Sequence, residues 1–172
     1  YHGQGTITLP EQYAAFAETC ARFVAQSKGC VIWIIGNEPN HPNERPQGKP
    51  ITPQAYGACF RLCYAAIKEV GRQHQVLPAA VGPWNAETKY PGNEQGDWVQ
   101  YFVDMLHACG ELDGMALHAY TRGDNPAMVF SEQRMNTPFQ HRRVSFRVYQ
   151  DFLDRVPAHL RHLPVLITEI DE

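Results

Sequence analysis

The chain of 172 residues lacks both a long apolar run and a basic face. Its most apolar stretch, "CVIWII" at residues 30–35, is followed at once by polar residues, whereas a membrane-spanning helix needs about 20 apolar residues. The formal net charge is -3, and the lysines and arginines are scattered along the chain. A nucleic-acid partner needs clustered positive charge, so neither nucleic acid nor a membrane is expected as a partner, and composition alone assigns no compartment.

Several motifs of metal and cofactor sites are also missing. The five cysteines form no CxxC pair and fit neither a zinc ribbon nor a dense disulfide framework, so we expect buried thiols. The eight histidines show no HExxH or comparable ligand spacing, which predicts that the chain holds no metal. Neither GxGxxG nor GxxxxGK[ST] follows an apolar run, so a nucleotide-binding fold is not favoured and no cofactor is expected.

Helical and strand patterns alternate four times along the chain. Stripes at helical spacing predict helices over residues 13–24, 53–70, 98–109 and 141–156. Short, doubly apolar runs predict strands over residues 31–36, 76–82, 114–120 and 163–170. Strands buried on both faces and alternating with helices are typical of an α/β fold with parallel strands, here a single unit spanning residues 1–172.

The connections between these elements are unequal. Those that lead into strands are short, such as "SKG" and "RHL". Those that leave strands are long and polar, at residues 40–51, 85–96 and 122–140. In parallel α/β proteins the carboxyl ends of the strands carry the active site, because the loops there can vary while the other edge closes the scaffold.

Two glutamates lie at this edge. Glu38 ends the first apolar run in "VIWIIGNEPN", and because it precedes Pro39 we expect an extended backbone there. Glu169 ends the last run in "VLITEI". A lone glutamate at a strand end is commonly solvated, but two that face one cleft satisfy the needs of glycoside hydrolysis, which are a proton for the leaving oxygen and a carboxylate at the anomeric carbon.

These motifs resemble the retaining β-glycosidases of the large (β/α)8 clan that includes cellulases, mannanases and β-xylosidases. "WIIGNEPN" is similar to that clan's fourth-strand motif, "LITEI" to its seventh-strand nucleophile motif, and "LHAY" to its sixth-strand His-x-Tyr. "GPWN" falls where the fifth strand opens into a substrate loop. The resemblance implies a TIM-barrel type fold, here a partial barrel of about four parallel strands and four helices.

The resemblance also implies roles for single residues. Glu38 would be the general acid and then the base, and Glu169 the nucleophile that forms a covalent glycosyl-enzyme. The remaining implied substrate contacts are Asn37 to the sugar 2-hydroxyl, Tyr120 as a donor to Glu169, and His118 and Trp84 lining the sugar subsite. A hydrogen-bonded core histidine stays open for His118, and a core or lid aromatic for Trp84.

The mechanism sets two physical requirements. Glu38 needs a pKa raised by burial and by the charge of Glu169, while Glu169 stays ionised. A retaining mechanism also needs carboxyl groups about 5 to 5.5 Å apart, whereas inversion needs roughly 6.5 to 9.5 Å. We predict the shorter separation.

A complete barrel has eight strands and about 250 residues, so half of it has no counterpart in this chain. Open strand edges need cover. Three arrangements are possible: the rest of the barrel on another chain segment, with this chain a fragment; a homodimer mate; or an open sheet that is stable alone. The competing functions are a carbohydrate-binding or scaffold remnant without turnover, and a different barrel chemistry with one glutamate as base.

Overall fold

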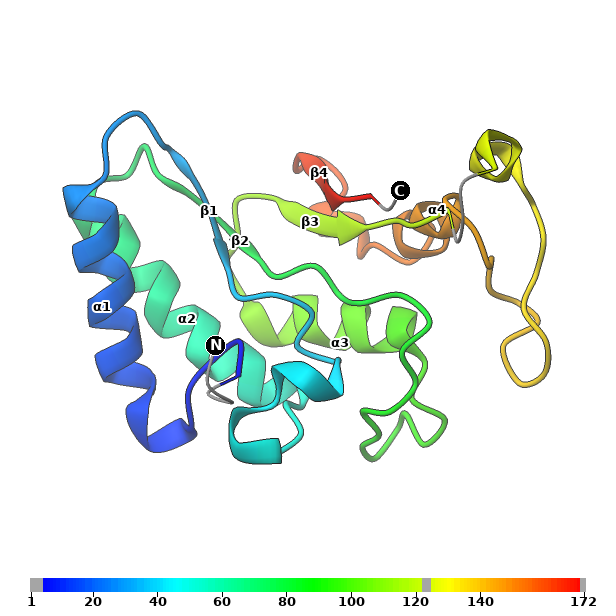
Figure 1. Ribbon diagram of the computed structural model, residues 1–172. Coiled ribbons are helices and arrows are strands. Elements are labelled where there is room, and N and C mark those ends of the chain that lie inside the picture. Colours follow the sequence, from blue (N-terminus) through cyan, green and yellow to red (C-terminus); the bar gives the residue numbers. More distant parts are fainter. Residues whose placement is uncertain (1–4, 122–124, 171–172) are drawn as a thin grey trace.

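The computed structural model describes residues 5–121 and 125–170, in which helices and short strands alternate (Figure 1). The strands are β1 (Ile32–Ile35), β2 (Gln75–Pro78), β3 (Met115–His118) and β4 (Val165–Glu169). The helices are α1 (Tyr13–Gln26), α2 (Pro53–Val70), α3 (Trp98–Cys109) and α4 (Val148–Leu153). The predicted order of elements is thus present in an α/β arrangement.

The strands form two parallel pairs. β1 pairs with β2 from Ile32 opposite Gln75 to Ile35 opposite Pro78, and β3 pairs with β4. Asp113 lies between the pairs: its backbone N–H donates to the Val76 carbonyl (3.1 Å), and its carboxylate accepts from the Val76 N–H (2.8 Å). A side chain therefore replaces part of the hydrogen-bonding ladder between β2 and β3, which explains why the parallel strands are split.

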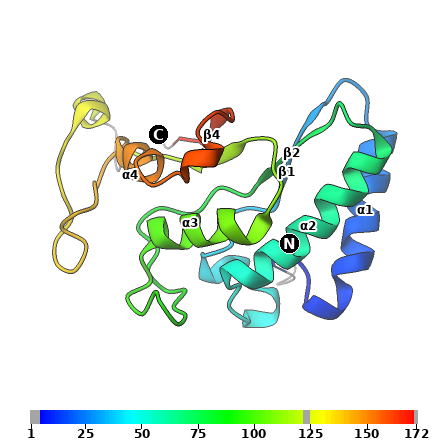
Figure 2. The same cartoon turned by 180° about the vertical axis from the view of Figure 1, so that it is seen from behind.

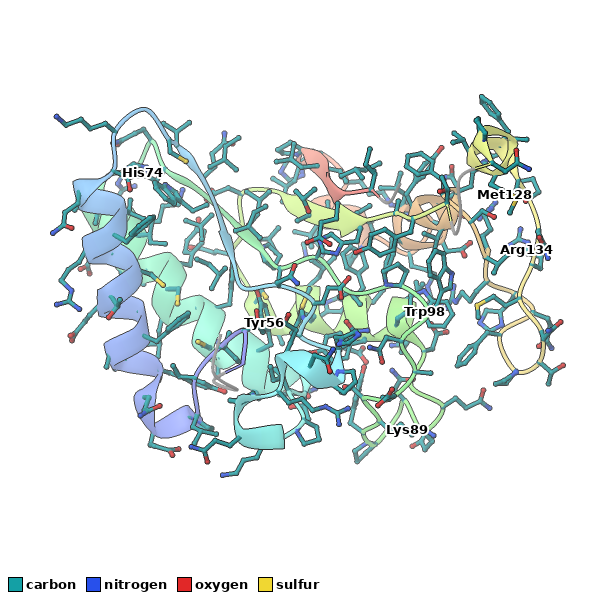
Figure 3. The ribbon with its side chains drawn as sticks, viewed as in Figure 1. Tyr56, His74, Lys89, Trp98, Met128 and Arg134 are labelled. Carbon is teal, nitrogen blue, oxygen red and sulfur yellow. The ribbon has the colours of Figure 1, made fainter. Side chains whose placement is uncertain are left out.

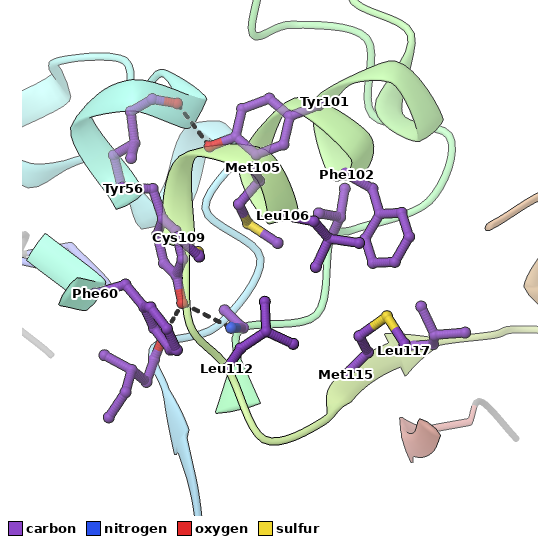
Figure 4. Packing of buried hydrophobic residues seen from close by; sticks show 14 of the residues in the cluster. Tyr56, Phe60, Tyr101, Phe102, Met105, Leu106, Cys109, Leu112, Met115 and Leu117 are labelled. Carbon is purple, nitrogen blue, oxygen red and sulfur yellow. Dashed lines mark hydrogen bonds between the residues drawn. The ribbon is translucent and has the colours of Figure 1, made fainter. Parts of the chain in front are cut away.

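Helices α1, α2 and α3 lie on one side of the strands, as both opposed views show (Figures 1 and 2). Their apolar stripes meet the strands in one continuous core (Figure 4). Tyr56 of α2 lies in this core with no exposed surface. Its hydroxyl donates to the Ile35 carbonyl (2.5 Å) and accepts from the Ala79 N–H (2.7 Å), so it joins the C-terminal ends of β1 and β2.

Side chains cap the starts of α2 and α3. Thr52 accepts a hydrogen bond from the Ala55 N–H (3.2 Å), and Asp97 accepts one from the Val99 N–H (2.9 Å). Pro53 follows Thr52 in the first turn of α2. Backbone N–H groups of the first turn have no intrahelical acceptor, so a proline there costs no helix hydrogen bond. Local sequence thus fixes where α2 and α3 begin.

The last helix is much shorter than predicted over 141–156. α4 covers only Val148–Leu153, because the residues before it pair elsewhere. Arg142 is buried and forms an ion pair with Asp97 (2.6 Å), and Arg143 pairs with Asp151 (2.5 Å). The backbone around them bridges Arg134 to Arg143, so it cannot also follow a helix. The charges of Arg142 and Arg143 form ion pairs that fold the segment back.

The long connections lie beyond the strands' C-terminal ends. Figure 3 shows Lys89 at the far end of the loop over residues 85–96. It also shows Met128 in a short 3-10 helix (Pro126–Phe130) and Arg134 further along the segment after β3. Residues 122–124 of the predicted 122–140 loop lie outside the described residues. The described part of this loop runs into the bridge that displaces the start of α4.

The five cysteines are all free. Cys59, Cys63 and Cys109 are buried as predicted, Cys20 is half-buried, and Cys30 is exposed, so the prediction of a buried thiol is wrong for Cys30. Cys30 lies in the turn before β1, where the chain has not yet entered the core.

The two outer strands carry exposed apolar side chains. These are Ile32 and Ile34 on β1, with Val165 and Ile167 on β4. No helix within the described residues is long and apolar enough to cross a bilayer.

The Tyr56 hydroxyl generates the first prediction. Tyr56→Phe leaves the Ile35 carbonyl and the Ala79 N–H without their partner inside the core, and an unpaired buried group costs about 1–3 kcal/mol. We expect the free energy of unfolding to fall by about 2 kcal/mol in urea denaturation. Tyr149→Phe, at a half-buried ring that packs on Phe146, is the matched control and should change it by less than about 0.5 kcal/mol. Equal effects of the two substitutions would contradict the bridging role.

Candidate active site

The strand ends bring four of the predicted residues together. His118 ends β3 opposite Glu169 of β4, after a register shift between Leu117 and His118. The Ala119 N–H donates to the Glu169 carbonyl (3.1 Å), which extends the pairing by one residue. His118 and Tyr120, two residues apart, project on the same side, as alternate residues of extended backbone do. Glu38 reaches this group from the end of β1.

The Tyr120 hydroxyl lies at the centre of the group. It is 3.0 Å from Glu38 Oε1, 2.8 Å from Glu169 Oε2 and 3.0 Å from His118 Nδ1. His118 Nδ1 is itself 2.8 Å from Glu38 Oε1 and 3.5 Å from Glu169 Oε2. The closest ligand atoms of Glu38, His118 and Glu169 all lie within 4.8 Å of one another, so the two strand-end carboxylates share one site.

The shortest contacts assign the protons of this network. The Tyr120 hydroxyl has one proton to donate and a histidine ring carries at least one N–H, while both carboxylates only accept when ionised. Tyr120 donating to Glu169 and His118 Nδ1–H donating to Glu38 use the two 2.8 Å contacts and satisfy both carboxylates. The contact from Tyr120 to Glu38 (3.0 Å) is the alternative hydrogen bond for the hydroxyl proton.

Glu38 has a lowered pKa, which contradicts the predicted increase. Burial does act to raise the pKa of this carboxyl, as expected, but hydrogen bonds from His118 and Tyr120 and the electrostatic influence of His118 and His41 outweigh it. The prediction failed because it counted burial and the opposing carboxylate but not the donors between them. Burial and the neighbouring carboxylates also raise the pKa of Tyr120, which therefore keeps its proton as a donor.

The two carboxylates differ in exposure. The side chain of Glu38 is 15% exposed and that of Glu169 is 47% exposed, while His118 is almost completely buried at 3%. His118 is therefore both a hydrogen-bonded core histidine and a member of the site, so the two alternatives for it are compatible.

Glu38 sits in a turn and not in the predicted extended conformation. Its φ is 34°, on the left-handed side, and its carbonyl accepts from the His41 N–H (2.7 Å). Gly36, with φ 88°, has already bent the chain toward Thr6, whose hydroxyl accepts from the Asn37 N–H. Pro39 disfavours the right-handed helical region for Glu38, and the chain meets that restriction with a positive φ.

Asn37 and Trp84 differ in their relation to the group. The Asn37 amide donates to Glu44 Oε1 (3.4 Å), and no described contact joins it to the other predicted site residues. The Trp84 ring centroid lies 6.0 Å from that of Tyr120, and its indole N–H donates to the Arg143 carbonyl (2.8 Å). Trp84 thus flanks the carboxylates, while Asn37 is turned toward the neighbouring loop.

Two further residues, which the motifs did not single out, support Glu38. Asn40 is 1% exposed and forms a pair of hydrogen bonds with Gly82, donating to its carbonyl (2.8 Å) and accepting from its N–H (2.8 Å). Gly82 lies directly against the Glu38 carboxyl. The available signals were an asparagine two residues after Glu38 and a glycine as the last residue of the second predicted strand.

Glu38, His118 and Glu169 also offer the kind of ligand atoms that hold a divalent cation. The sequence spacing predicted no metal, and spacing alone does not reveal this group because it is assembled from three strands. All three atoms already contact the Tyr120 hydroxyl, so an ion would have to displace it. The arrangement is complete as a proton network, and we derive no metal chemistry from it.

Comparison of the chain with protein-family models and with curated proteins found no match.

The lowered pKa of Glu38 generates a prediction about stability and pH. A carboxyl whose folded pKa lies below its unfolded value stabilises the fold above the unfolded pKa, and this contribution is lost as the pH falls through the folded pKa. Relative to Glu38→Gln, we expect the wild type to lose stability between about pH 7 and about pH 3. Urea denaturation of both proteins at the two pH values measures this, and parallel pH dependences would contradict it.

Proposed function

We propose that the chain carries the catalytic site of a retaining β-glycoside hydrolase that acts on a β-linked oligo- or polysaccharide. One observation supports this most: two carboxylates from separate strand ends meet at one hydroxyl, with their nearest oxygens within 4.8 Å. An oxygen–oxygen gap of at most 4.8 Å favours a retaining pair over an inverting pair, whose carboxyl groups lie roughly 6.5 to 9.5 Å apart to leave room for water. The proposal includes the (β/α)8 barrel as the complete fold.

In the first step, a Glu169 oxygen attacks the anomeric carbon. The bond to the leaving-group oxygen breaks as Glu38 delivers its proton there, which yields a covalent glycosyl ester of Glu169. The Tyr120 hydroxyl donates to the Glu169 oxygen (2.8 Å) and orients it for attack.

In the second step, Glu38 acts as base. It removes a proton from water as the water oxygen attacks the anomeric carbon, and the ester bond to Glu169 breaks. Both carboxyls return to their starting states, and two inversions give net retention. His118 Nδ1, 2.8 Å from Glu38 Oε1, supports the carboxylate form that this step requires.

Trp84 supplies a flat apolar face at the edge of the site, which suits a pyranose ring. Polar backbone and side-chain groups beside it line a hollow of about 360 Å³ together with His41 and Asn85. The Asn37 contact to the sugar 2-hydroxyl stays part of the proposal, and it requires Asn37 to exchange its long bond to Glu44 for one to substrate.

The exposed apolar residues of β1 and β4 favour a covered assembly over a sheet that is open in solution. The remainder of a barrel on another chain segment, or a homodimer mate, would pair with these strands. A catalytically incompetent carbohydrate-binding remnant is the alternative function, because the Glu169 side chain, 47% exposed, has open space where a complete barrel would close around it.

Carboxyl substitutions test the assigned roles. On an aryl β-glycoside with a good leaving group, Glu38→Gln should slow breakdown of the glycosyl-enzyme, and azide should restore turnover and give a β-glycosyl azide. Glu169→Ala should give no covalent intermediate, and azide should yield the α-glycosyl azide. On substrates with a sugar leaving group, Glu38→Gln should reduce kcat/KM by roughly 10²–10⁴-fold. Product anomers are read by NMR.

Glu44→Gln, which removes a carboxylate from the loop beside Asn37, serves as the comparison and should leave the product anomer unchanged. Saturable sugar binding without turnover would favour the carbohydrate-binding remnant. Initial release of the inverted anomer would contradict the covalent mechanism.

The lowered pKa of Glu38 also predicts the pH profile of the enzyme. Only molecules with a protonated Glu38 can donate in the first step, and above the Glu38 pKa that fraction falls about tenfold for each pH unit. We therefore expect kcat/KM for a substrate with a sugar leaving group to be greatest on the acid side and to fall as the pH rises toward neutrality. Initial rates across buffers of constant ionic strength measure this, and a maximum above neutral pH would contradict it.

A further inference from the structure

We propose that Asn40 and Gly82 are positioning residues that hold the Glu38 carboxyl against His118 and Tyr120. The inference builds on the proposed function, in which Glu38 is the acid and base. In this inference Asn40 and Gly82 set the position of the Glu38 carboxyl and take no part in the chemical steps themselves.

Asn40 joins the segment after β1 to the segment after β2. Its side-chain amide donates to the Gly82 carbonyl (2.8 Å) and accepts from the Gly82 N–H (2.8 Å). It also donates to the Asn85 carbonyl (3.4 Å). The Thr88 hydroxyl donates to the Asn40 carbonyl (2.6 Å). A buried amide with all these bonds made is expensive to displace, because each unpaired group would lose its partner away from water.

Gly82 forms the wall on which the Glu38 carboxyl rests. A Cβ at this position would lie 2.8 Å from the carboxyl carbon of Glu38 and 2.9 and 3.1 Å from its two oxygens. The φ of Gly82 is not in the left-handed region, so an alanine fits the backbone there. Glycine is therefore required by the carboxyl and not by the chain conformation.

These two observations act on the same contact. Asn40 fixes where Gly82 lies, and Gly82 fixes how close the carboxyl comes to the strand ends. The titratable groups that face Glu38 are His41 from its own segment, His118 at the end of β3, Tyr120 just after β3, and Glu169 from β4. If the Glu38 carboxyl moves away from His118 and Tyr120, the hydrogen bonds that lower its pKa become weaker. Burial and the charge of Glu169, which raise its pKa, still act.

The test uses Asn40→Ala and Gly82→Ala in protein labelled with ¹³C at the glutamate carboxyls. The Glu38 resonance is identified by its absence in Glu38→Gln. We expect both substitutions to raise the Glu38 pKa by about one unit, since the opposing burial effect is no longer offset. If the protein turns over glycosides, the falling limb of its kcat/KM profile should move to higher pH by the same amount.

Two control variants separate positioning from general loss of stability. Asn93→Ala removes a buried asparagine away from the two carboxylates. Like Asn40, Asn93 forms two hydrogen bonds with the backbone of a single residue: it accepts from the Asp97 N–H (2.8 Å) and donates to the Asp97 carbonyl (2.9 Å). Gly114→Ala places a Cβ within 3.0 Å of the Pro164 carbonyl in the scaffold. Both should lower the melting temperature and leave the Glu38 titration unchanged.

The inference is overturned if Glu38 keeps its wild-type pKa in a folded Asn40→Ala or Gly82→Ala protein. It is also overturned if the control variants shift the Glu38 pKa by the same amount. Failure of both test variants to fold while the controls fold also counts against it, because the role would then be one of the whole scaffold. The titration needs no turnover, so an inactive protein with the expected shift would contradict the proposed hydrolase and leave the positioning role intact.

Discussion

The Tyr120 hydroxyl is the contact on which the rest of the site depends, because it is the group that touches both strand-end carboxylates. One O–H cannot donate fully to two acceptors, so a second donor is needed if both carboxylates are to be ionised. His118 Nδ1 supplies it. The register shift that sets His118 opposite Glu169 is therefore more than a local irregularity, since it brings the two donors and the second carboxylate to one level.

Magnitudes explain why Glu38 ionises readily despite its burial. Two unit charges about 5 Å apart repel by about 3 kcal/mol at an effective dielectric constant of about 20, and by less where one is half exposed, as Glu169 is. Each hydrogen bond to a charged group contributes about 1.5–3 kcal/mol. The hydrogen bond from His118, together with the Tyr120 hydroxyl that Glu38 shares with Glu169, is thus enough to offset the repulsion and part of the desolvation, in agreement with the lowered pKa of Glu38.

The sequence predicted those features that depend on neighbours along the chain. Helical stripes located α2 and α3, and the apolar runs that end in Glu38 and Glu169 located the two carboxylates. It could not predict features that depend on distant partners. The local sequence predicts Arg142 to be helical, but Arg142 forms a buried ion pair with Asp97, which lies 45 residues earlier in the chain. Likewise, proline alone could not reveal that Glu38 turns, because the bend is fixed by Thr6 and His41.

The backbone near the carboxylates carries a further sign that this region is specialised. Glu38 and Trp84 are two of the three described non-glycine residues with positive φ, at 34° and 62°, and such conformations cost on the order of 1–3 kcal/mol each. A tryptophan has no local reason to adopt one. Both residues follow strands that end at the same edge, and both are held by bonds to other segments, Glu38 through its carboxylate and Trp84 through the Arg143 carbonyl. The scaffold thus opposes local preference at the two positions that flank the Tyr120 hydroxyl, which is expected where side-chain direction matters more than local stability.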